Sequence, residues 1–145
     1  MTETFHLQLP SHTDFLDLIR DFISKLSVYA GFGDENVYKI SLAVDEACTN
    51  IIRHAYDEGN IRLIDIETEI NNGQFTVIVS DTGKGFNPDD VGEPDLQDYI
   101  VRHKVGGFGL YLIKTLMDEV EFSIEPGVRT AVRMTKFLDK EQKTQ

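Results

Sequence analysis

The sequence predicts an α+β fold, a two-layer sandwich in which one mixed, mostly antiparallel sheet carries its helices on a single face. Apolar residues recur at helical spacing over 14–29 and over 34–56. Elsewhere apolar and polar residues alternate in short runs, and glycine-containing turns at 71–73 and 126–127 join these runs in pairs as hairpins. With 145 residues and 41% hydrophobic content, the chain suits one compact domain with its own core.

The N-terminal part of the chain is predicted to form one strand and two helices. The strand covers 4–9, where apolar and polar residues alternate. Ser11 is expected to cap the helix over 14–29, which ends at a pair of glycines. Asp34 is expected to cap the second and longer helix, over 34–56, whose apolar stripe should lie on the core.

The C-terminal part is predicted to contribute four strands and one further helix. The strands cover 61–70, 75–79, 120–125 and 130–137, and the helix runs from about 110 to 119. A glycine-rich loop begins at Asp81 and leads into a polar stretch, 89–104, that is expected to be a mobile flap. We expect residues 1–138 to form a single domain and the polar residues 139–145 to be a frayed tail.

Composition excludes several classes of function. The 25 acidic and 14 basic residues give a net charge of −11, which disfavours binding to a nucleic-acid backbone. No apolar stretch approaches the ~20 residues needed to span a bilayer, and no leader-like segment begins the chain, so we expect a cytoplasmic protein without membrane contact. Cys48 is the only cysteine, which excludes a disulfide or zinc framework, and its place on the apolar side of a helix predicts a buried thiol.

Two polar residues of the long helix need an explanation beyond structure. Glu46 and Asn50 are one turn apart, and they lie beside the apolar stripe instead of opposite it. Buried polar groups are costly unless something satisfies them. A carboxylate and an amide oxygen at this spacing suit a magnesium ion, and a carboxylate can also orient an attacking water. The alternative is a pair of solvated surface side chains.

Two glycine-containing segments each have a structural and a functional interpretation. Asp81-x-Gly83-x-Gly85 is typical of a strand-exit loop, but its glycines also leave room for a flat ligand. The Asp81 carboxylate could then accept a hydrogen bond from an exocyclic amine. The run from Gly107 to Leu110 is typical of a tight turn, but before a helix it also offers backbone amides to a phosphate. It is not a Walker loop, because no Gly-Lys-Ser/Thr follows.

Taken in order, these segments resemble a known family. They resemble the N, G1 and G2 boxes of the GHKL (Bergerat-fold) ATPases, the group of gyrase, Hsp90, histidine kinases and MutL. The matching segments are Glu46-x-x-x-Asn50, Asp81-x-Gly83-x-Gly85 and Gly107-x-Gly109-Leu110. More closely, the stretches 44–47, 54–56 and 118–120 resemble the bacterial anti-sigma factor serine kinases of the RsbW and SpoIIAB type. The resemblance covers nearly the whole chain.

The resemblance implies a role for each matching residue. Asn50 would hold Mg2+, and Glu46 would be the general base that polarises the attacking hydroxyl or water. Asp81 would bind the adenine amino group. The other residues would line the ATP pocket: Gly83 and Gly85 beside the base, Gly107, Gly109 and Leu110 at the phosphates, and Thr130 near adenine. The stretch 86–105 would be the ATP lid, and Arg129 stands where family members usually have a glycine before the threonine.

The implied activity is that of an ATP- and Mg2+-dependent serine kinase. It would phosphorylate a small anti-anti-sigma antagonist protein of the STAS type, and in a competing state it would sequester a sigma factor. Family members commonly work as homodimers. Two rival interpretations are a nucleotide-gated binding module without kinase activity and a stand-alone histidine-kinase-like domain. The second interpretation is disfavoured, because the sequence before the boxes shows no His-bearing pair of dimerisation helices, which such a kinase needs.

Several neighbours of the boxes have two possible roles. Asp45 is expected to be a charge on the helix surface, because it points about a hundred degrees away from Glu46. Arg53 could reach phosphate but is more typical of a solvated face, and His54 could do so but is more typical of a helix end. Lys104 closes the lid with Arg102, where a cation could neutralise the γ-phosphate.

Overall fold

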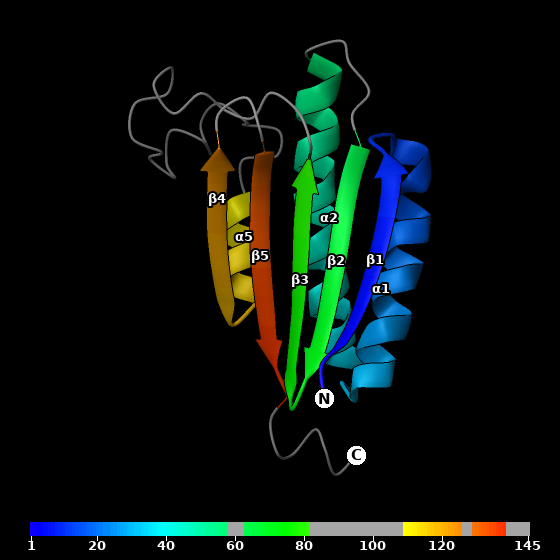
Figure 1. Ribbon diagram of the computed structural model, residues 1–145, viewed down its shortest axis with the longest axis vertical. Coiled ribbons are helices and arrows are strands. Elements are labelled where there is room, and N and C mark those ends of the chain that lie inside the picture. Colours follow the sequence, from blue (N-terminus) through cyan, green and yellow to red (C-terminus); the bar gives the residue numbers. More distant parts are fainter. Residues whose placement is uncertain (58–62, 82–108, 126–128, 139–145) are drawn as a thin grey trace.

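The computed structural model describes residues 1–57, 63–81, 109–125 and 129–138, without the side chains of 54–57, 109–110, 124–125 and 129–130. Its elements follow one another in the order that the sequence predicts (Figure 1). The helical elements are a 3-10 turn (Thr13–Phe15), α1 (Leu16–Ala30), α2 (Asp34–Asp57) and α5 (Gly109–Leu116). The strands are β1 (Glu3–Pro10), β2 (Leu63–Asn71), β3 (Gln74–Asp81), β4 (Glu119–Glu125) and β5 (Arg129–Phe137).

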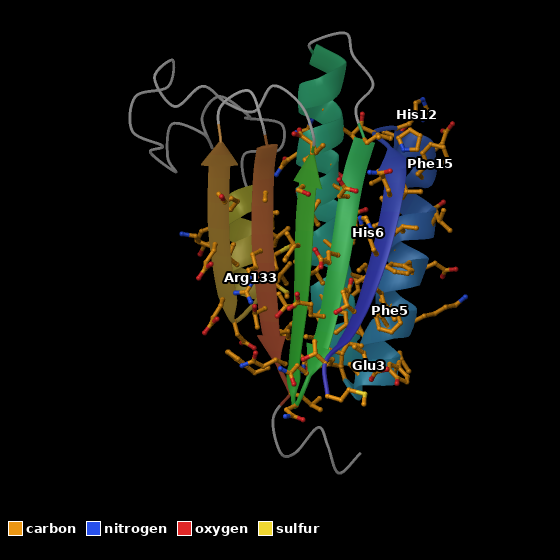
Figure 2. The ribbon with its side chains drawn as sticks, viewed as in Figure 1. Glu3, Phe5, His6, His12, Phe15 and Arg133 are labelled. Atoms are coloured by element: carbon orange, nitrogen blue, oxygen red, sulfur yellow. The ribbon has the colours of Figure 1, made fainter. Side chains whose placement is uncertain are left out.

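The strands form one sheet with the order β1-β2-β3-β5-β4, and every neighbouring pair is antiparallel. Helices α1, α2 and α5 all lie on one face, and no described element covers the other face (Figure 1). Successive side chains of a strand point to opposite faces, so Ile66 is fully buried under the helices while Asp65 and Glu67 are on the uncovered side. Figure 2 places His6 and Arg133 on that uncovered side too. The predicted α+β sandwich is confirmed.

The hydrophobic core lies between the sheet and the helices. Its fully buried side chains come from the three helices and the central strands and include Ile19 and Ile23 of α1, Ile40 and Cys48 of α2, Ile64 and Val77 of the sheet, and Ile113 of α5. Burying an aliphatic side chain of this size contributes roughly 1.5–3 kcal/mol. The apolar stripe of α2 therefore fixes this helix, and every polar residue it carries, at a set position over the sheet. The thiol of Cys48 is buried, as the sequence predicts.

The hairpin between β2 and β3 follows from its turn sequence. Asn72 has φ 38° and Gly73 has φ 83°. Two successive residues with positive φ are typical of a type I′ turn, whose twist matches that of the paired strands. The N–H of Leu138 donates to the Gly73 carbonyl at 2.7 Å, so the residue after β5 is tied to this hairpin.

One local expectation about the first helix is wrong. The sequence predicts Ser11 as its cap, but His12 caps the 3-10 turn, where its Nδ1 atom accepts the hydrogen bond from the Asp14 N–H at 3.1 Å, and α1 itself follows Phe15 without a side-chain cap. Ser11 is buried instead. The flap expected over 89–104 and the tail over 139–145 lie outside the described residues. Within the described ranges, no helix is long and apolar enough to cross a membrane.

Candidate functional site

Helix α2 carries three polar side chains at helical spacing. Glu46, Asn50 and Arg53 are separated by four and then three residues, so one stripe of the helix presents all of them. The side chains of Ala47 and Ile51 belong to the core and flank this stripe. The packing that fixes α2 on the sheet therefore also draws these polar groups into partly buried positions.

Asn50 is the most buried of the three. It is 6% exposed, and its Oδ1 atom is buried without a hydrogen-bond partner in the described part of the chain. Leaving such an acceptor unsatisfied costs about 1–3 kcal/mol. An oxygen in this state suits a hard cation or a water bound to one. The described residues contain no cluster of three or more His, Cys, Asp or Glu side chains that could hold a metal ion.

Glu46 lies one turn before Asn50 and is half-buried. Burial raises the pKa of its carboxyl, the neighbouring Asp45 carboxylate raises it further, and the Arg53 guanidinium acts in the opposite direction. The net result is a raised pKa, which makes the Glu46 carboxylate a stronger base than an exposed glutamate. Such a group can accept the proton of an attacking hydroxyl.

Arg53 differs from the solvated side chain that the sequence suggested. It is half-buried, and its Nη1 atom is buried without a hydrogen-bond partner in the described ranges. Its effect on the pKa of Glu46 places its charge near that carboxylate. A buried guanidinium nitrogen is costly to leave unpaired, and phosphate oxygens match its donors well. The sequence signal that could have found this residue is its spacing of seven from Glu46.

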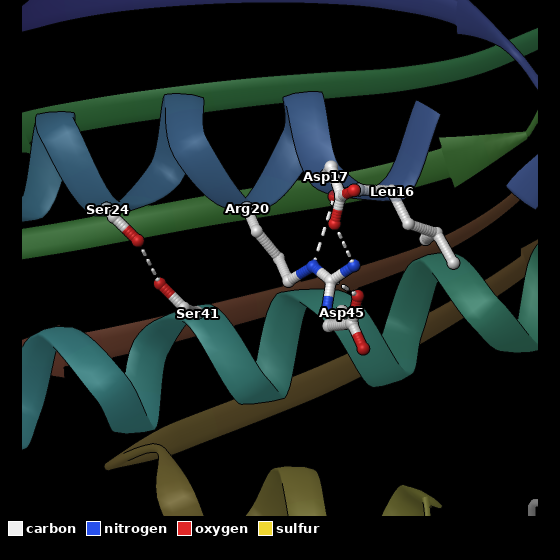
Figure 3. Close-up of polar contacts among 6 residues, drawn as sticks. All are labelled: Leu16, Asp17, Arg20, Ser24, Ser41 and Asp45. Carbon is white, nitrogen blue, oxygen red and sulfur yellow. Dashed lines mark hydrogen bonds and ion pairs between the residues drawn. The ribbon is translucent and has the colours of Figure 1, made fainter. Parts of the chain in front are cut away.

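Asp45 is also not the surface charge that was expected. It is half-buried between α1 and α2, with its Oδ1 atom 3.5 Å from Nε of Arg20, an ion pair without a hydrogen bond (Figure 3). Arg20 pairs with Asp17 on its own helix as well. Burial raises the pKa of Asp45, and the Arg20 charge offsets only part of this effect. Along the same seam, the hydroxyl oxygens of Ser24 and Ser41 are 2.7 Å apart.

Asp81 is the last residue of β3 and lies on the helix-covered face. It shares this face with Val77 and Val79, which are fully buried, and it is itself 2% exposed. In the strand register it stands opposite Ile64 of β2 and Thr130 of β5. The structure therefore brings Asp81 and Thr130 side by side at one end of the sheet.

Helix α5 begins at Gly109 and packs against α2. Its first turn lies toward the end of the sheet where β3 ends (Figure 1). The first turn of a helix has unpaired N–H groups and a favourable dipole for an anion. Leu110 belongs to this turn. Other residues that the sequence assigned to the site lie outside the described residues: Gly83, Gly85, Lys104 and Gly107.

This fold and these residues define a class of protein, the histidine kinase-like ATPase domains, whose family profile matches residues 9–136 of the chain. Within that class, the chain is 35% identical to the serine-protein kinase RsbW of Halalkalibacterium halodurans, over 97% of this chain and 86% of that one. It is 36% identical to RsbW of Staphylococcus aureus, over 94% and 87% of the two chains. The chain belongs to the RsbW family of serine-protein kinases, which confirms the resemblance seen in its sequence.

Two solved structures share the fold. The RsbU and RsbW domains of Rv1364c from Mycobacterium tuberculosis align with a TM-score of 0.68 and 17% identity, over 94% of this chain and 32% of that chain. The SiaB–SiaC complex from Pseudomonas aeruginosa aligns with a TM-score of 0.61 and 13% identity, over 90% of this chain and 88% of that chain. At these identities the likeness shows the fold alone.

Proposed function

We propose that the chain is an ATP- and Mg2+-dependent serine kinase that phosphorylates a small anti-anti-sigma protein of the STAS type and, in a competing state, binds a sigma factor. Its place in the RsbW family of serine-protein kinases supports the kinase activity. The observation that carries the proposal is the polar stripe of α2. On that stripe Asn50 follows the half-buried Glu46 by one turn and precedes Arg53 by another, and within the described residues its Oδ1 atom and the Arg53 Nη1 atom are buried without a hydrogen-bond partner.

The residues of this stripe fit a magnesium ion that arrives with ATP. Asn50 would hold it through Oδ1, directly or through a water, because that oxygen is buried and lacks another partner among the described residues. When bound, such an ion supplies positive charge to the phosphate oxygens. Arg53 would donate hydrogen bonds to the same phosphates and stabilise their charge during transfer.

The chemical step needs a base for the serine hydroxyl. As the serine oxygen forms its bond to the γ-phosphorus, Glu46 accepts the hydroxyl proton, and the bond from that phosphorus to the bridging oxygen of ADP breaks. The products are phosphoserine, ADP and a protonated Glu46, which then releases its proton to water. The raised pKa of Glu46 supports this role, because it brings the basicity of the carboxylate closer to that of the group it must deprotonate.

The same proposal assigns the nucleotide contacts. Asp81 accepts a hydrogen bond from the adenine amine, and its position beside Thr130 on the helix-covered face supports this. The other contacts remain those expected from the sequence: room for the base at Gly83 and Gly85, phosphate amides at Gly107, Gly109 and Leu110, and a cation at Lys104. A single domain over 1–138, a homodimer and a cytoplasmic location are further parts of the proposal.

The transfer of labelled phosphate tests this function. Purified protein and γ-labelled Mg-ATP are added to a lysate of the native host, and labelled serine peptides are identified by mass spectrometry. We expect one small protein to be labelled by the parent chain and not by Asn50→Ala. Asn71→Ala, at an exposed position of the β2–β3 hairpin, is the control and should label like the parent. Calorimetric ATP binding without any label would leave a nucleotide-gated binding module instead.

A further inference from the structure

We infer that Lys136 is a positioning residue for phosphate binding: it anchors the last turn of α5 to β5 and thereby fixes where the first turn of that helix meets the nucleotide. The inference rests on the proposed function, because it takes the first turn of α5 as the phosphate-binding end. It concerns a residue about one helix length away from that end, with no contact to the nucleotide itself.

Lys136 is buried in a place where an apolar side chain would be ordinary. It is 8% exposed, and its register partner on β3 is the fully buried Phe75, so it lies on the helix-covered face of the sheet. Its Nζ atom donates to the backbone carbonyl of Leu116 at 2.7 Å and lies 3.8 Å from Oδ1 of Asp118. Leu116 is the last residue of α5, so the lysine satisfies a carbonyl that the helix itself leaves unpaired.

Asp118 holds the same corner from the other side. Its N–H donates to the Thr135 carbonyl at 2.9 Å, and its Oδ2 atom accepts from the Phe137 N–H at 2.7 Å. Together with the Lys136 bond, these contacts tie the corner between α5 and β4 directly to β5. A cation at this end of a helix is also favoured by the helix dipole.

Hydrophobic burial alone does not require a lysine here. Taking an amine out of water is costly unless it is paired, whereas a methionine would fill a similar volume without that cost. A hydrogen bond to a helix terminus adds a directional contact, which restrains the position of α5 along its axis beyond what the apolar contacts provide. Ile113 and Met117 hold α5 against the core, and Lys136 stops it from sliding there.

Strand β5 thereby fixes the positions of the groups expected at both ends of the nucleotide. It carries Thr130 opposite Asp81 at one end and the anchor of α5, Lys136, at the other. Helix α5 has eight residues, which corresponds to a rigid segment of about 12 Å. A shift at its last turn is therefore transmitted to its first turn. Loss of the anchor should misplace the phosphate-binding amides relative to the adenine pocket.

The test compares the Kd values of ATP and adenosine, measured by calorimetry on the full chain. For Lys136→Met we expect ATP binding to weaken on the order of tenfold while the Kd of adenosine stays within about twofold, because only the phosphate contacts depend on α5. Lys114→Met is the matched control. It removes the same charge from the exposed side of α5, where no anchor to β5 is lost, so both affinities should remain those of the parent.

Equal losses of affinity for ATP and adenosine would show that Lys136 has only a general structural role, and this would overturn the inference. Unchanged ATP binding would overturn it too, because the anchor would then have no effect on the phosphate contacts. Asp118→Ala repeats the test with Lys136 in place, because it removes the acceptor of the Phe137 N–H. It should give the same selective loss, and it decides the matter if Lys136→Met does not fold. A parent chain that binds neither ligand would contradict the proposed function itself, an outcome distinct from the others.

Discussion

Four polar residues of α2, Asp45, Glu46, Asn50 and Arg53, occupy half-buried or buried positions that stability alone would give to apolar side chains. Asn50 has a buried oxygen without a hydrogen bond in the described chain, and Arg53 has a nitrogen in the same state. Burial also raises the pKa values of Asp45 and Glu46, so the folded protein disfavours their charged forms. Groups held at such a cost are typical of functional sites.

Replacing the proposed base should separate binding from chemistry. Glu46→Gln keeps the size and a hydrogen-bonding oxygen but cannot accept a proton, so we expect ATP affinity near that of the parent and a kcat about 10²–10⁴-fold lower. Calorimetry and a phosphotransfer assay measure the two quantities. Glu35→Gln, an exposed substitution in the first turn of α2, is the control. A Glu46→Gln variant with the turnover of the parent would remove Glu46 from the role of base.

The raised pKa of Asp45 predicts a pH-dependent stability. The pKa of Asp45 is higher in the folded chain than in the unfolded chain, so at pH values between these two pKa values the folded chain binds more protons than the unfolded chain. The stability therefore falls as the pH rises through this range. Asp45→Asn removes this effect. The difference in Tm, variant minus parent, should therefore be more positive at pH 7 than at pH 3.5.

The control for Asp45 is Ser41→Ala, which removes a neutral hydroxyl from the same seam between α1 and α2. Its difference in Tm should be the same at both pH values. If Asp45→Asn also shifted Tm equally at pH 7 and pH 3.5, its carboxyl would not be destabilised in its charged form.

At the residue scale, the sequence predicts those features that depend on spacing along a single helix. Glu46 and Asn50 were expected beside an apolar stripe because both belong to one helix, and Asn50 is indeed buried. The surroundings of Asp45 and Lys136 depend on residues distant in sequence. Arg20 of α1 and the last turn of α5 reach these side chains only after the helices have packed on the sheet.

At the scale of elements, the two faces of the sheet contribute very differently to the free energy of unfolding. Ile66 and Glu67 are neighbours on β2, but Ile66 is fully buried under the helices and Glu67 is on the uncovered face. Ile66→Ala should lower the free energy of unfolding by about 2–5 kcal/mol. Glu67→Ala should change it by no more than about 0.5 kcal/mol. Urea denaturation measures both, and comparable losses would contradict the assignment of faces.

Hydrophobic periodicity predicted the order and type of the elements because each is a local property. The β2–β3 hairpin was foreseeable from Asn72 and Gly73, which tolerate the positive φ values that the turn adopts. The cap of the first helix was not. Both Ser11 and His12 can accept a backbone hydrogen bond, and the local sequence does not show which of the two takes the cap position.

For the whole molecule, the contacts of Leu138 predict where the domain ends. Its N–H bonds to the Gly73 carbonyl, and its side chain packs against the core and lies 3.3 Å from the place where a Cβ on Gly31 would stand. A chain ending at 138 should keep the Tm of the full chain. A chain ending at 137 should melt about 4 °C lower, the shift that corresponds to a loss of roughly 1 kcal/mol. Equal Tm values for the two truncations would place the boundary elsewhere.

The buried thiol of Cys48 allows the opening of this protein to be followed by chemical labelling. Only a thiolate reacts readily with a disulfide reagent, and burial both shields Cys48 and raises its pKa, so labelling has to wait until α2 leaves the sheet. Because Cys48 is the only cysteine and stands between Glu46 and Asn50, no engineered probe is needed. A nucleotide that binds only the closed helix would slow the labelling by a factor of about 1 + [L]/Kd. The rate of one reaction at one sulfur atom thus reports how firmly the nucleotide holds the fold together.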